Sequence, residues 1–501
     1  MVEILKSTND RSLRSLVDLD QGLVSREIYV NEEIYQQELE QVFGRAWLFI
    51  GHETQVPNPG DFVVSRMGEE HVILVRDRKG KIHVFLNTCR HRGMKVCRYD
   101  DGNTLLFTCP FHGWSYDTEG HLVGVPNFDN AYHRELDKSS WGLHEVAQMV
   151  NYYGGIWATW DPKAPPFDDY LGAFAPSVRR SFEGSDGEDN GLEVFNPTQK
   201  WRLPTNWKFP GFSFYGDHAH GATTHRSTTV AAYGPQGEAN GGSRHGMAQR
   251  WPTVEEEFAI PELGHSGHGK LYENPGVGPY VDTWQTVPGV DDYYREKNAK
   301  KAAKYAGQFL HGAQGCVFPN VITGGTRILV WHPQGVGMTE SWRLYTVDRD
   351  APKLVKDAVR RYAMRYCGPG GMTESDDMEN WNYAYPASLG TMARRLPYNF
   401  QNGVGHAHTD DRVPGITLNY RIGEENQRAR LKRWVEFMEA GSWDELYPVK
   451  QNAWWGAPRW PSIRLGPSRR SNVYSSKTRS RTSSTTRPSC STSAVSATGS
   501  S

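Results

Sequence analysis

The chain has 501 residues, a formal net charge of -1 and only six cysteines. Because this length exceeds that of an ordinary domain, we expect two or three domains. The balanced charge argues against nucleic acid or an anionic membrane as a partner, and so few cysteines argue against a disulfide framework.

The N-terminal 47 residues are predicted to be a polar arm over 1–25 and a helix over 31–47. We expect the arm and helix to pack on a neighbouring domain. Asn31 is a good helix cap, and apolar side chains recur behind it near helical spacing, at Ile34, Leu39, Val42, Phe43 and Trp47. No apolar leader opens the chain and no apolar run of about 18 residues follows, so we expect a soluble, cytoplasmic protein.

Residues 48–161 are predicted to form an antiparallel β domain. Short β-rich runs, such as 62–65 and 71–76, alternate with turns rich in Gly, Pro and Asn. A proline-rich stretch from Pro162 to Pro176 then predicts a linker into a second domain, which we place at 162–460.

The β domain carries two pairs of metal-binding side chains. Cys89 and His91 form a Cys-x-His pair, Cys109 and His112 form a Cys-x2-His pair, and seventeen residues separate the pairs. Two thiolates and two imidazoles suit either a tetrahedral zinc or a 2Fe-2S cluster with both cysteines on one iron and both histidines on the other. Zinc fingers usually pair Cys with Cys and His with His, whereas each loop here offers one cysteine and one histidine. We therefore predict an iron-sulfur cluster.

A second group of metal-binding side chains lies in the second domain. Asp217, His220 and His225 are spaced so that the two imidazoles could converge on one ion from a helix face, or from a helix followed by a loop. His218 is a competing imidazole. A two-histidine site with open positions needs one carboxylate to form the facial triad of a mononuclear non-haem Fe(II) centre.

Further elements are predicted between this group and the next motif. They are a Gly-rich surface stretch at 234–248, a helix over 291–307, neighbouring antiparallel strands at 327–331 and 341–347, and an amphipathic helix over 352–366 with Leu354 on its apolar side. Arg327 and Arg343 fall in the strand patterns, where we interpret them as surface charges rather than as partners of a substrate carboxylate.

Candidates for the carboxylate of this triad lie at 372–381, where Asp376 and Asp377 follow Thr373. Thr373 is predicted to cap a new helix that has Asp377 in its first turn. The alternative is that these acids only complement the helix dipole. The last segment, 461–501, is predicted to be a disordered or artefactual tail, because it becomes rich in Ser, Thr and Arg and nearly free of large apolar residues; a basic nucleic-acid tail is the alternative.

These motifs resemble those of a known family. Between about Gly22 and Tyr447 the chain resembles the α subunits of Rieske non-haem iron ring-hydroxylating dioxygenases. The resemblance rests on the two Cys/His pairs, on Asn206-Trp-Lys followed by Asp217-x2-His220-x4-His225, and on Glu374-Ser-Asp-Asp377 with Asn380. It implies an α+β fold, with an antiparallel β Rieske domain and a catalytic domain whose large antiparallel sheet is covered by helices, of the helix-grip or START-like type.

The family pattern also implies roles for single residues. His220, His225 and Asp377 resemble the iron ligands, and Asp217 resembles a bridge from an iron-binding histidine to a cluster histidine of the neighbouring subunit. The chain departs from the pattern at 209–213, where Pro210-Gly211 is expected to break or kink a helix. The residues expected to line a substrate pocket are Phe212, Ser213, Phe214, Tyr215 and Phe318.

The resemblance implies a terminal oxygenase that adds both atoms of O2 to an aromatic ring and forms a cis-dihydrodiol. Its cofactors are a 2Fe-2S Rieske cluster and a mononuclear Fe(II). Because the chain shows no Gly-rich dinucleotide fingerprint, electrons are expected from NADH through a separate reductase and ferredoxin. A small β subunit in an α3β3 assembly is also implied. The alternatives are a Rieske monooxygenase or demethylase, a Rieske electron carrier with a non-catalytic binding domain, and a zinc-stabilised interaction protein.

Overall fold

The described part of the structure belongs to the unit Met1–Ala453. The computed structural model describes residues 12–446 apart from gaps at 214–216, 218–219, 227–254, 272–287, 307–308, 325–326 and 419–422. The Gly-rich stretch predicted at 234–248 and the tail predicted at 461–501 therefore lie outside the described residues. Among the described helices, none combines the length and the apolar character that a membrane crossing requires.

The predicted polar arm contains regular structure within its described part. Its elements and those that follow are η2 (Leu13–Leu16), β1 (Val17–Asp18), β2 (Leu23–Val24), α1 (Glu27–Val30), α2 (Glu32–Glu38) and η3 (Leu39–Phe43). Asn31 caps α2 as predicted, because its side chain accepts a hydrogen bond from Ile34 N at 3.1 Å. The helix ends at Phe43, earlier than expected. Trp47 lies beyond it, and its indole N–H donates to Pro165 O.

The β domain consists of antiparallel sheets, as predicted. Their strand orders are β6-β5-β4-β7, β10-β9-β8 and β11-β12-β3. The strands are β3 (Leu48–His52), β4 (Asp61–Met67), β5 (Glu70–Arg76), β6 (Ile82–Leu86), β7 (Asp101–Asn103), β8 (Leu106–Thr108), β9 (Ser115–Asp117), β10 (Leu122–Gly124), β11 (Gln148–Tyr152) and β12 (Gly155–Thr159). The apolar run in β5 is continuous because the strand separates two cores: Val72 and Leu74 face one, and Ile73 and Val75 face the other.

The proline-rich stretch predicted as a linker is packed helical structure. It contains α3 (Phe167–Leu171), η6 (Gly172–Phe174) and α4 (Ala175–Ser181). Pro166 precedes α3 and Pro176 stands in the first turn of α4, positions where proline's missing N–H costs nothing. Tyr170 is buried, and its hydroxyl donates to Phe318 O at 2.7 Å. These prolines therefore mark helix starts.

The second domain is built on one eight-stranded antiparallel sheet. Its strands, in spatial order, are β13 (Leu192–Leu203), β19 (Thr339–Asp348), β18 (Arg327–Pro333), β17 (Val321–Gly324), β16 (Phe309–Val317), β15 (His265–Leu271), β14 (Glu255–Ile260) and β21 (Ile416–Leu418). The strands predicted at 327–331 and 341–347 are the neighbours β18 and β19, with Arg327 opposite Tyr345.

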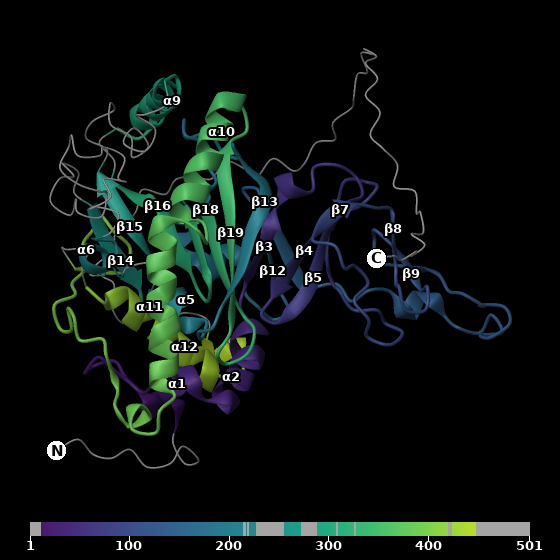
Figure 1. Ribbon diagram of the computed structural model, residues 1–501, viewed down its shortest axis with the longest axis horizontal. Helices are drawn as coiled ribbons and strands as arrows, with labels where there is room; N and C mark the ends of the chain where they lie inside the picture. The colour runs from purple at the N-terminus through teal and green to yellow at the C-terminus, as the bar shows by residue number, and fades with distance from the viewer. Residues whose placement is uncertain are drawn as a thin grey trace, which may run out of the picture. The chain divides into compact units, whose positions relative to one another are not determined.

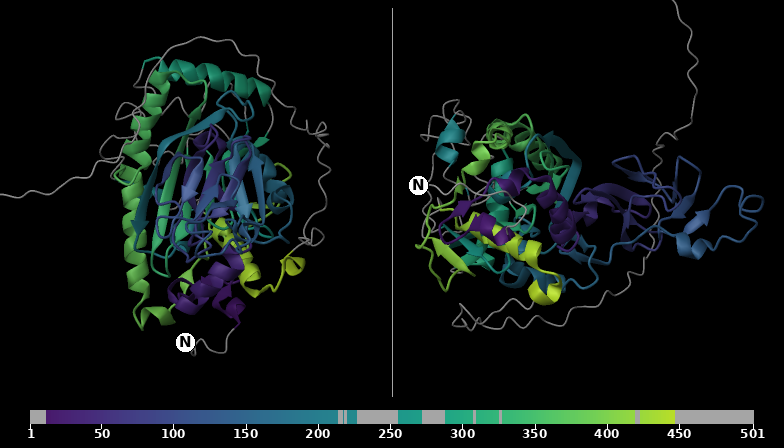
Figure 2. Two further views of the ribbon diagram at one scale, coloured as in Figure 1. Left: turned by 90° about the vertical axis from the view of Figure 1, so that its right-hand side faces the viewer. Right: turned by 90° about the horizontal axis from the view of Figure 1, so that it is seen from below.

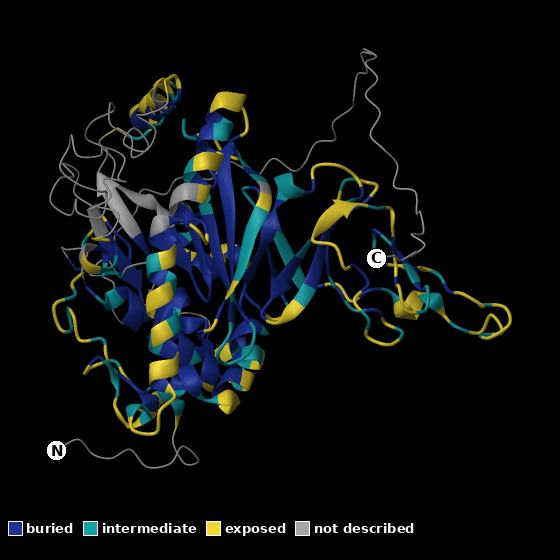
Figure 3. Cartoon of the chain, viewed as in Figure 1, coloured by how far each residue is buried: buried dark blue, intermediate teal, exposed yellow. Residues whose placement is uncertain are grey.

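Helices cover this sheet, which confirms the predicted α+β architecture. They include α5 (Lys208–Ser213), α6 (Gly221–Thr224), α9 (Val290–Lys304), α10 (Lys353–Tyr362), α11 (Met372–Ser388), α12 (Glu425–Glu439) and α13 (Trp443–Leu446). α9 and α10 confirm two predicted helices, and a π-helical turn, η9 (Ala363–Cys367), continues α10. α10 and α11 run along the sheet (Figure 1) and keep one side exposed (Figure 3). Leu354, expected on the buried side of α10, is 49% exposed.

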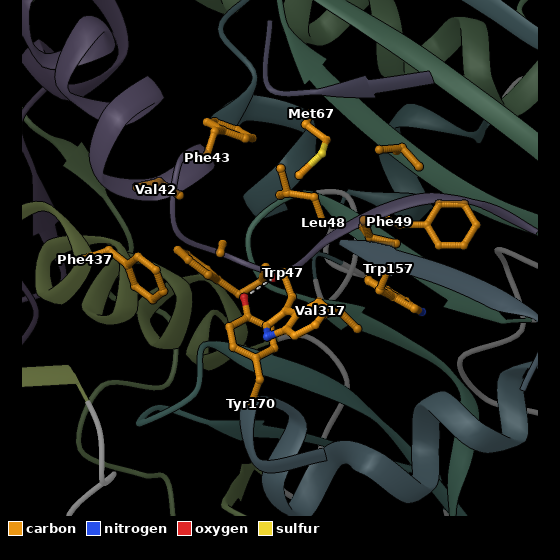
Figure 4. Packing of buried hydrophobic residues seen from close by; sticks show 14 of the residues in the cluster. Val42, Phe43, Trp47, Leu48, Phe49, Met67, Trp157, Tyr170, Val317 and Phe437 are labelled. Atoms are coloured by element: carbon orange, nitrogen blue, oxygen red, sulfur yellow. Dashed lines mark hydrogen bonds between the residues drawn. The ribbon is translucent and has the colours of Figure 1, made fainter. Parts of the chain in front are cut away.

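A main hydrophobic core joins the N-terminal helix, the β domain and the second domain. Phe43 of η3, Trp157 of β12, Val317 of β16 and Phe437 of α12 lie in this packed group (Figure 4), and all four are buried. Burying each large apolar side chain is worth roughly 1.5–3 kcal/mol. Because these segments are distant in the chain, the two domains share one interior.

A buried carboxylate ties the N-terminal helix to α5 and α12, which lies beside the N-terminal helices (Figure 2). Glu38 accepts hydrogen bonds from Lys208 Nζ at 2.5 Å and from the indole nitrogens of Trp207 and Trp434, both at 2.8 Å. Both charged side chains of this ion pair are fully buried. Removing one partner of such a pair typically costs about 3–5 kcal/mol, because the other charge stays buried and unpaired.

Candidate metal centres

The two Cys/His loops repeat one hydrogen-bonding pattern. In each loop the cysteine N–H donates to the backbone oxygen five residues later, and the N–H four residues after the cysteine donates back to the cysteine oxygen. The donor–acceptor pairs are Cys89–Met94, Gly93–Cys89, Cys109–Trp114 and Gly113–Cys109, with lengths of 2.8–3.0 Å. The second loop is the tip of the β8–β9 hairpin. Two equivalent turns thus present one thiol and one imidazole each.

The four candidate ligand side chains divide into a buried and a partly exposed pair. Cys89 and Cys109 are each 2% exposed, whereas His91 and His112 are partly exposed. The two imidazole rings lie 4.5 Å apart between centroids. Burial raises the pKa of the Cys109 thiol, so metal binding there must displace a proton. The arrangement turns the two thiols inward and the two imidazoles toward the surface.

The four side chains do not converge on a single point. Among the described residues, one group of three or more possible ligands has all its ligand atoms within 4.8 Å of one another. That group is His220, His225 and Asp377, and it does not include the Cys/His side chains. One tetrahedral zinc would require such convergence, because its ligands lie only about 2.0–2.3 Å from the metal. A cluster with two irons spreads its ligands over two centres. The geometry therefore fits 2Fe-2S better than zinc.

Tyr116 is a further residue of this site that the sequence pattern did not reveal. Its hydroxyl accepts the Arg90 N–H at 3.1 Å and lies 3.4 Å from Cys89 Sγ. Because the oxygen already accepts one hydrogen bond, its own proton is free to point at the sulfur. Hydrogen bonds to cysteine sulfurs tune the potential of an iron-sulfur cluster.

The glycines of the two loops offer a matched pair of variants. Gly93 and Gly113 have similar positive φ angles, 73° and 75°. A Cβ on Gly93 would meet nothing within 4 Å, whereas one on Gly113 would lie 2.8 Å from Pro126 Cγ. We expect Gly93→Ala to cost about 1–2 kcal/mol of backbone strain and to keep its cluster. Gly113→Ala should lose stability further and bind less acid-labile sulfide per chain. Equal sulfide content in the two variants would contradict this.

The second group of predicted ligands converges closely. His220 Nε2 and His225 Nε2 lie 3.2 Å apart, and each lies 3.3 Å from Asp377 Oδ1. Cis ligands of an octahedral ion with bonds of about 2.1 Å would be separated by about 3.0 Å, and tetrahedral ones by about 3.4 Å. His220 and His225 flank α6, and Asp377 comes from α11. Two imidazoles and one carboxylate in this geometry suit a mononuclear non-haem iron with open positions.

Further carboxylates lie behind the two imidazoles. Asp217 Oδ2 is 3.5 Å from His220 Nδ1, and Asp376 Oδ2 is 3.5 Å from His225 Nδ1. Burial lowers the pKa of His220, but the Asp217 hydrogen bond and the Asp377 charge outweigh it, so the net pKa is raised. Carboxylates in these places hold the ring nitrogens Nε2 toward a metal. The competing His218 lies outside the described residues.

α11 begins differently from the prediction. The helix starts at Met372 after Gly371, so Thr373 lies inside it and does not cap it, and no side chain caps this end. Asp377 is consequently in the second turn rather than the first. Only 6% of Asp377 is exposed and it faces the imidazoles, so its place is not explained by the helix dipole alone.

Comparison with known proteins decides the family. Residues 46–146 match the family model of the Rieske [2Fe-2S] domain. Over 445 residues the chain is 36% identical to the α subunit of biphenyl 2,3-dioxygenase from Rhodococcus jostii strain RHA1, covering 87% of this chain and 93% of that protein. The chain belongs to the α subunits of Rieske aromatic ring-hydroxylating dioxygenases. As a member, it carries a 2Fe-2S Rieske cluster and a mononuclear iron, which sets aside the zinc protein and the electron carrier.

Two more relatives of this oxygenase cover nearly the same span. The α subunit of chlorobenzene dioxygenase from Cupriavidus sp. strain PS12 is 36% identical over 454 residues, covering 89% of this chain and 97% of that protein. Among solved structures, naphthalene 1,2-dioxygenase from Rhodococcus sp. bound to indole matches with a TM-score of 0.71 at 31% identity, covering 87% of this chain and 99% of that one.

The oxygenase forms a helix where Pro210-Gly211 was expected to break one. Pro210 is the third residue of α5, in the first turn, where a missing N–H breaks no intrahelical bond. Asn206 Oδ1 accepts from Lys208 N at the start of the helix, and Arg430 Nη1 donates to Gly211 O and Phe212 O, at 3.1 and 2.8 Å, at its end. Side-chain contacts from other segments thus hold α5 at both ends.

The predicted pocket residues fall in two groups. Phe212 and Phe318 are each 1% exposed and belong to the main core of the oxygenase, where Phe318 packs on Phe437 with ring centroids 5.1 Å apart. Phe214, Tyr215 and the side chain of Ser213 lie outside the described residues.

The two strand arginines are not surface charges. Arg343 is fully buried and paired with Glu374 of α11, and Arg327 donates to Cys367 Sγ at the end of η9. The alternating pattern of a strand does not reveal such partners, because they come from helices that follow later in the chain.

Proposed function

We propose that the protein is the terminal oxygenase component that adds both atoms of O2 to an apolar aromatic ring and forms a cis-dihydrodiol. The observation that carries this proposal is the convergence of His220, His225 and Asp377 within 3.3 Å. It is supported by relatives named for biphenyl and chlorobenzene, each 36% identical to this chain. Within the chain, the domain at 48–161 would carry the cluster and the domain at 162–460 the mononuclear iron.

His220, His225 and Asp377 would hold the mononuclear iron and leave positions open on one side of it. When bound, the iron supplies the activation of O2, which side chains alone cannot provide. Asp217 would accept the Nδ1 proton of His220, and Asp376 lies 3.5 Å from Nδ1 of His225, so the two carboxylates would keep both Nε2 atoms turned toward the metal. The chain's own contribution is therefore a fixed, one-sided ligand set.

Cys89, His91, Cys109 and His112 would hold the Rieske cluster, with its histidine side at the surface. Asp217 is 35% exposed, so it can reach past its own chain. We place it as the bridge to a cluster histidine of a neighbouring subunit, in an α3β3 assembly with a small β subunit. Electrons would come from NADH through a reductase and a ferredoxin, one at a time.

The deciding experiment follows both oxygen atoms into the product. The purified oxygenase is supplied with reductase, ferredoxin, NADH and either biphenyl or naphthalene, under 18O2. We expect a cis-dihydrodiol with two labelled oxygens and one NADH consumed per product. A product with one labelled oxygen would instead establish a monooxygenase, and loss of the methyl group from a methoxylated aromatic supplied in a parallel assay would establish a demethylase.

A further inference from the structure

A buried ion pair joins α11 to the sheet one helical turn before Asp377. Arg343 of β19 and Glu374 of α11 contact each other through Nη2 and Oε1, and their side chains are 0% and 2% exposed. The pair lies at the start of the helix that carries the carboxylate proposed for the iron.

The sheet, and not the helix, fixes the guanidinium. Arg343 Nη1 donates to Ser341 Oγ at 2.9 Å and to Trp342 O at 3.0 Å. The guanidinium carbon lies over the indoles of Trp201 and Trp331, 4.9 and 5.0 Å from their ring centroids. Held by two hydrogen bonds and two aromatic faces, Arg343 presents a stationary charge to α11.

Glu374 and Asp377 are three residues apart, so they lie on the same side of α11 with an axial separation of about 4.5 Å. No side chain caps this end of the helix. Two later contacts join α11 to the histidine segment: Asp376 Oδ2 lies 3.5 Å from His225 Nδ1, and Asn380 Nδ2 donates to Thr224 Oγ1 at 3.2 Å. Ahead of these contacts, the buried ion pair anchors the first turn of α11 to the sheet.

We infer that Arg343 and Glu374 form a positioning pair that sets the rotation and axial position of α11, and so places Asp377 against His220 and His225. This inference rests on the proposed role of Asp377 as an iron ligand. Energetics points the same way, because a buried ion pair rarely stabilises a fold more than well-packed apolar residues would. The ion pair places the carboxylate of Asp377, and an apolar pair in the same position would not.

The test separates placement from folding. Glu374→Gln removes one charge and keeps the shape, and the double variant Arg343→Met with Glu374→Leu removes both charges. Asp357→Asn is the control, since it disrupts an exposed ion pair with Lys353 on the adjacent helix α10. Each protein is purified anaerobically and measured for melting temperature, acid-labile sulfide, Fe(II) affinity of the mononuclear site, and the electron paramagnetic resonance signal of its Fe(II)–NO adduct.

We expect Glu374→Gln to melt at a lower temperature and the double variant to recover most of that loss. Both should keep two sulfides per chain, bind mononuclear Fe(II) about 10- to 100-fold more weakly, and show an altered Fe(II)–NO signal. A double variant with wild-type Fe(II) affinity and signal would overturn the inference, as would failure of both variants to fold. A wild type without mononuclear iron would instead overturn the proposed function.

Discussion

Replacing Asp377 by alanine is expected to remove the mononuclear iron and leave the Rieske cluster in place. Asp377 contributes a carboxylate oxygen that lies 3.3 Å from the Nε2 atoms of both His220 and His225. Iron and acid-labile sulfide, measured in anaerobically purified protein, should fall from about three irons per two sulfides to about two per two. Product formation should fall to background, while the visible spectrum of the cluster stays unchanged.

Glu379→Ala is the matched control for this variant, because Glu379 is an exposed acid on the same helix. It should retain about three irons and normal activity. If Asp377→Ala also kept three irons, the carboxylate ligand would have to be another residue, and Asp376 would be the first to replace.

Replacing Asp217 by asparagine is expected to slow turnover without removing either metal. The asparagine carbonyl can still accept the His220 Nδ1 proton, so the orientation of the imidazole is kept while the negative charge is lost. We expect steady-state product formation to fall by about 10- to 100-fold with both metal contents unchanged. The decisive measurement is stopped-flow reoxidation of the reduced cluster with substrate and O2, which should slow to the same degree.

Asp376→Asn is the informative comparison, since Asp376 holds the equivalent place behind His225. It should likewise keep both metals, but leave reoxidation of the cluster at its normal rate. Loss of iron from Asp217→Asn, with normal cluster reoxidation after reloading, would show that Asp217 only supports the metal and carries no electron between subunits.

The cluster loops and the pair of His220 and His225 could be predicted because their information is local. Cys89 and His112 lie in one short stretch, and the spacing from His220 to His225 is set by one turn of helix. The fold class also followed from short strands, turn residues and the family resemblance. Asp377 needed that resemblance, because several acids stand close together in its segment.

What the sequence could not reveal depends on contacts between distant segments. Pro210 was expected to break a helix, yet its effect depends on where the helix starts, and Asn206 and Arg430 determine this. Arg343 was expected at the surface, because nothing in strand β19 shows that Glu374 will neutralise it. Tyr116 was missed because its role depends on the position of Cys89 Sγ across the loop.

The buried Glu38 also sets the order in which the chain can mature during synthesis. Its partners Lys208 and Trp434 follow it by 170 and 396 residues, so they leave the ribosome at very different times. The four proposed cluster ligands emerge early and close together, between Cys89 and His112. The segment that leads to His220 cannot be seated on Glu38 and Trp434 until almost the whole described chain has been made. We therefore expect the cluster site to be complete on the nascent chain before the mononuclear iron site is.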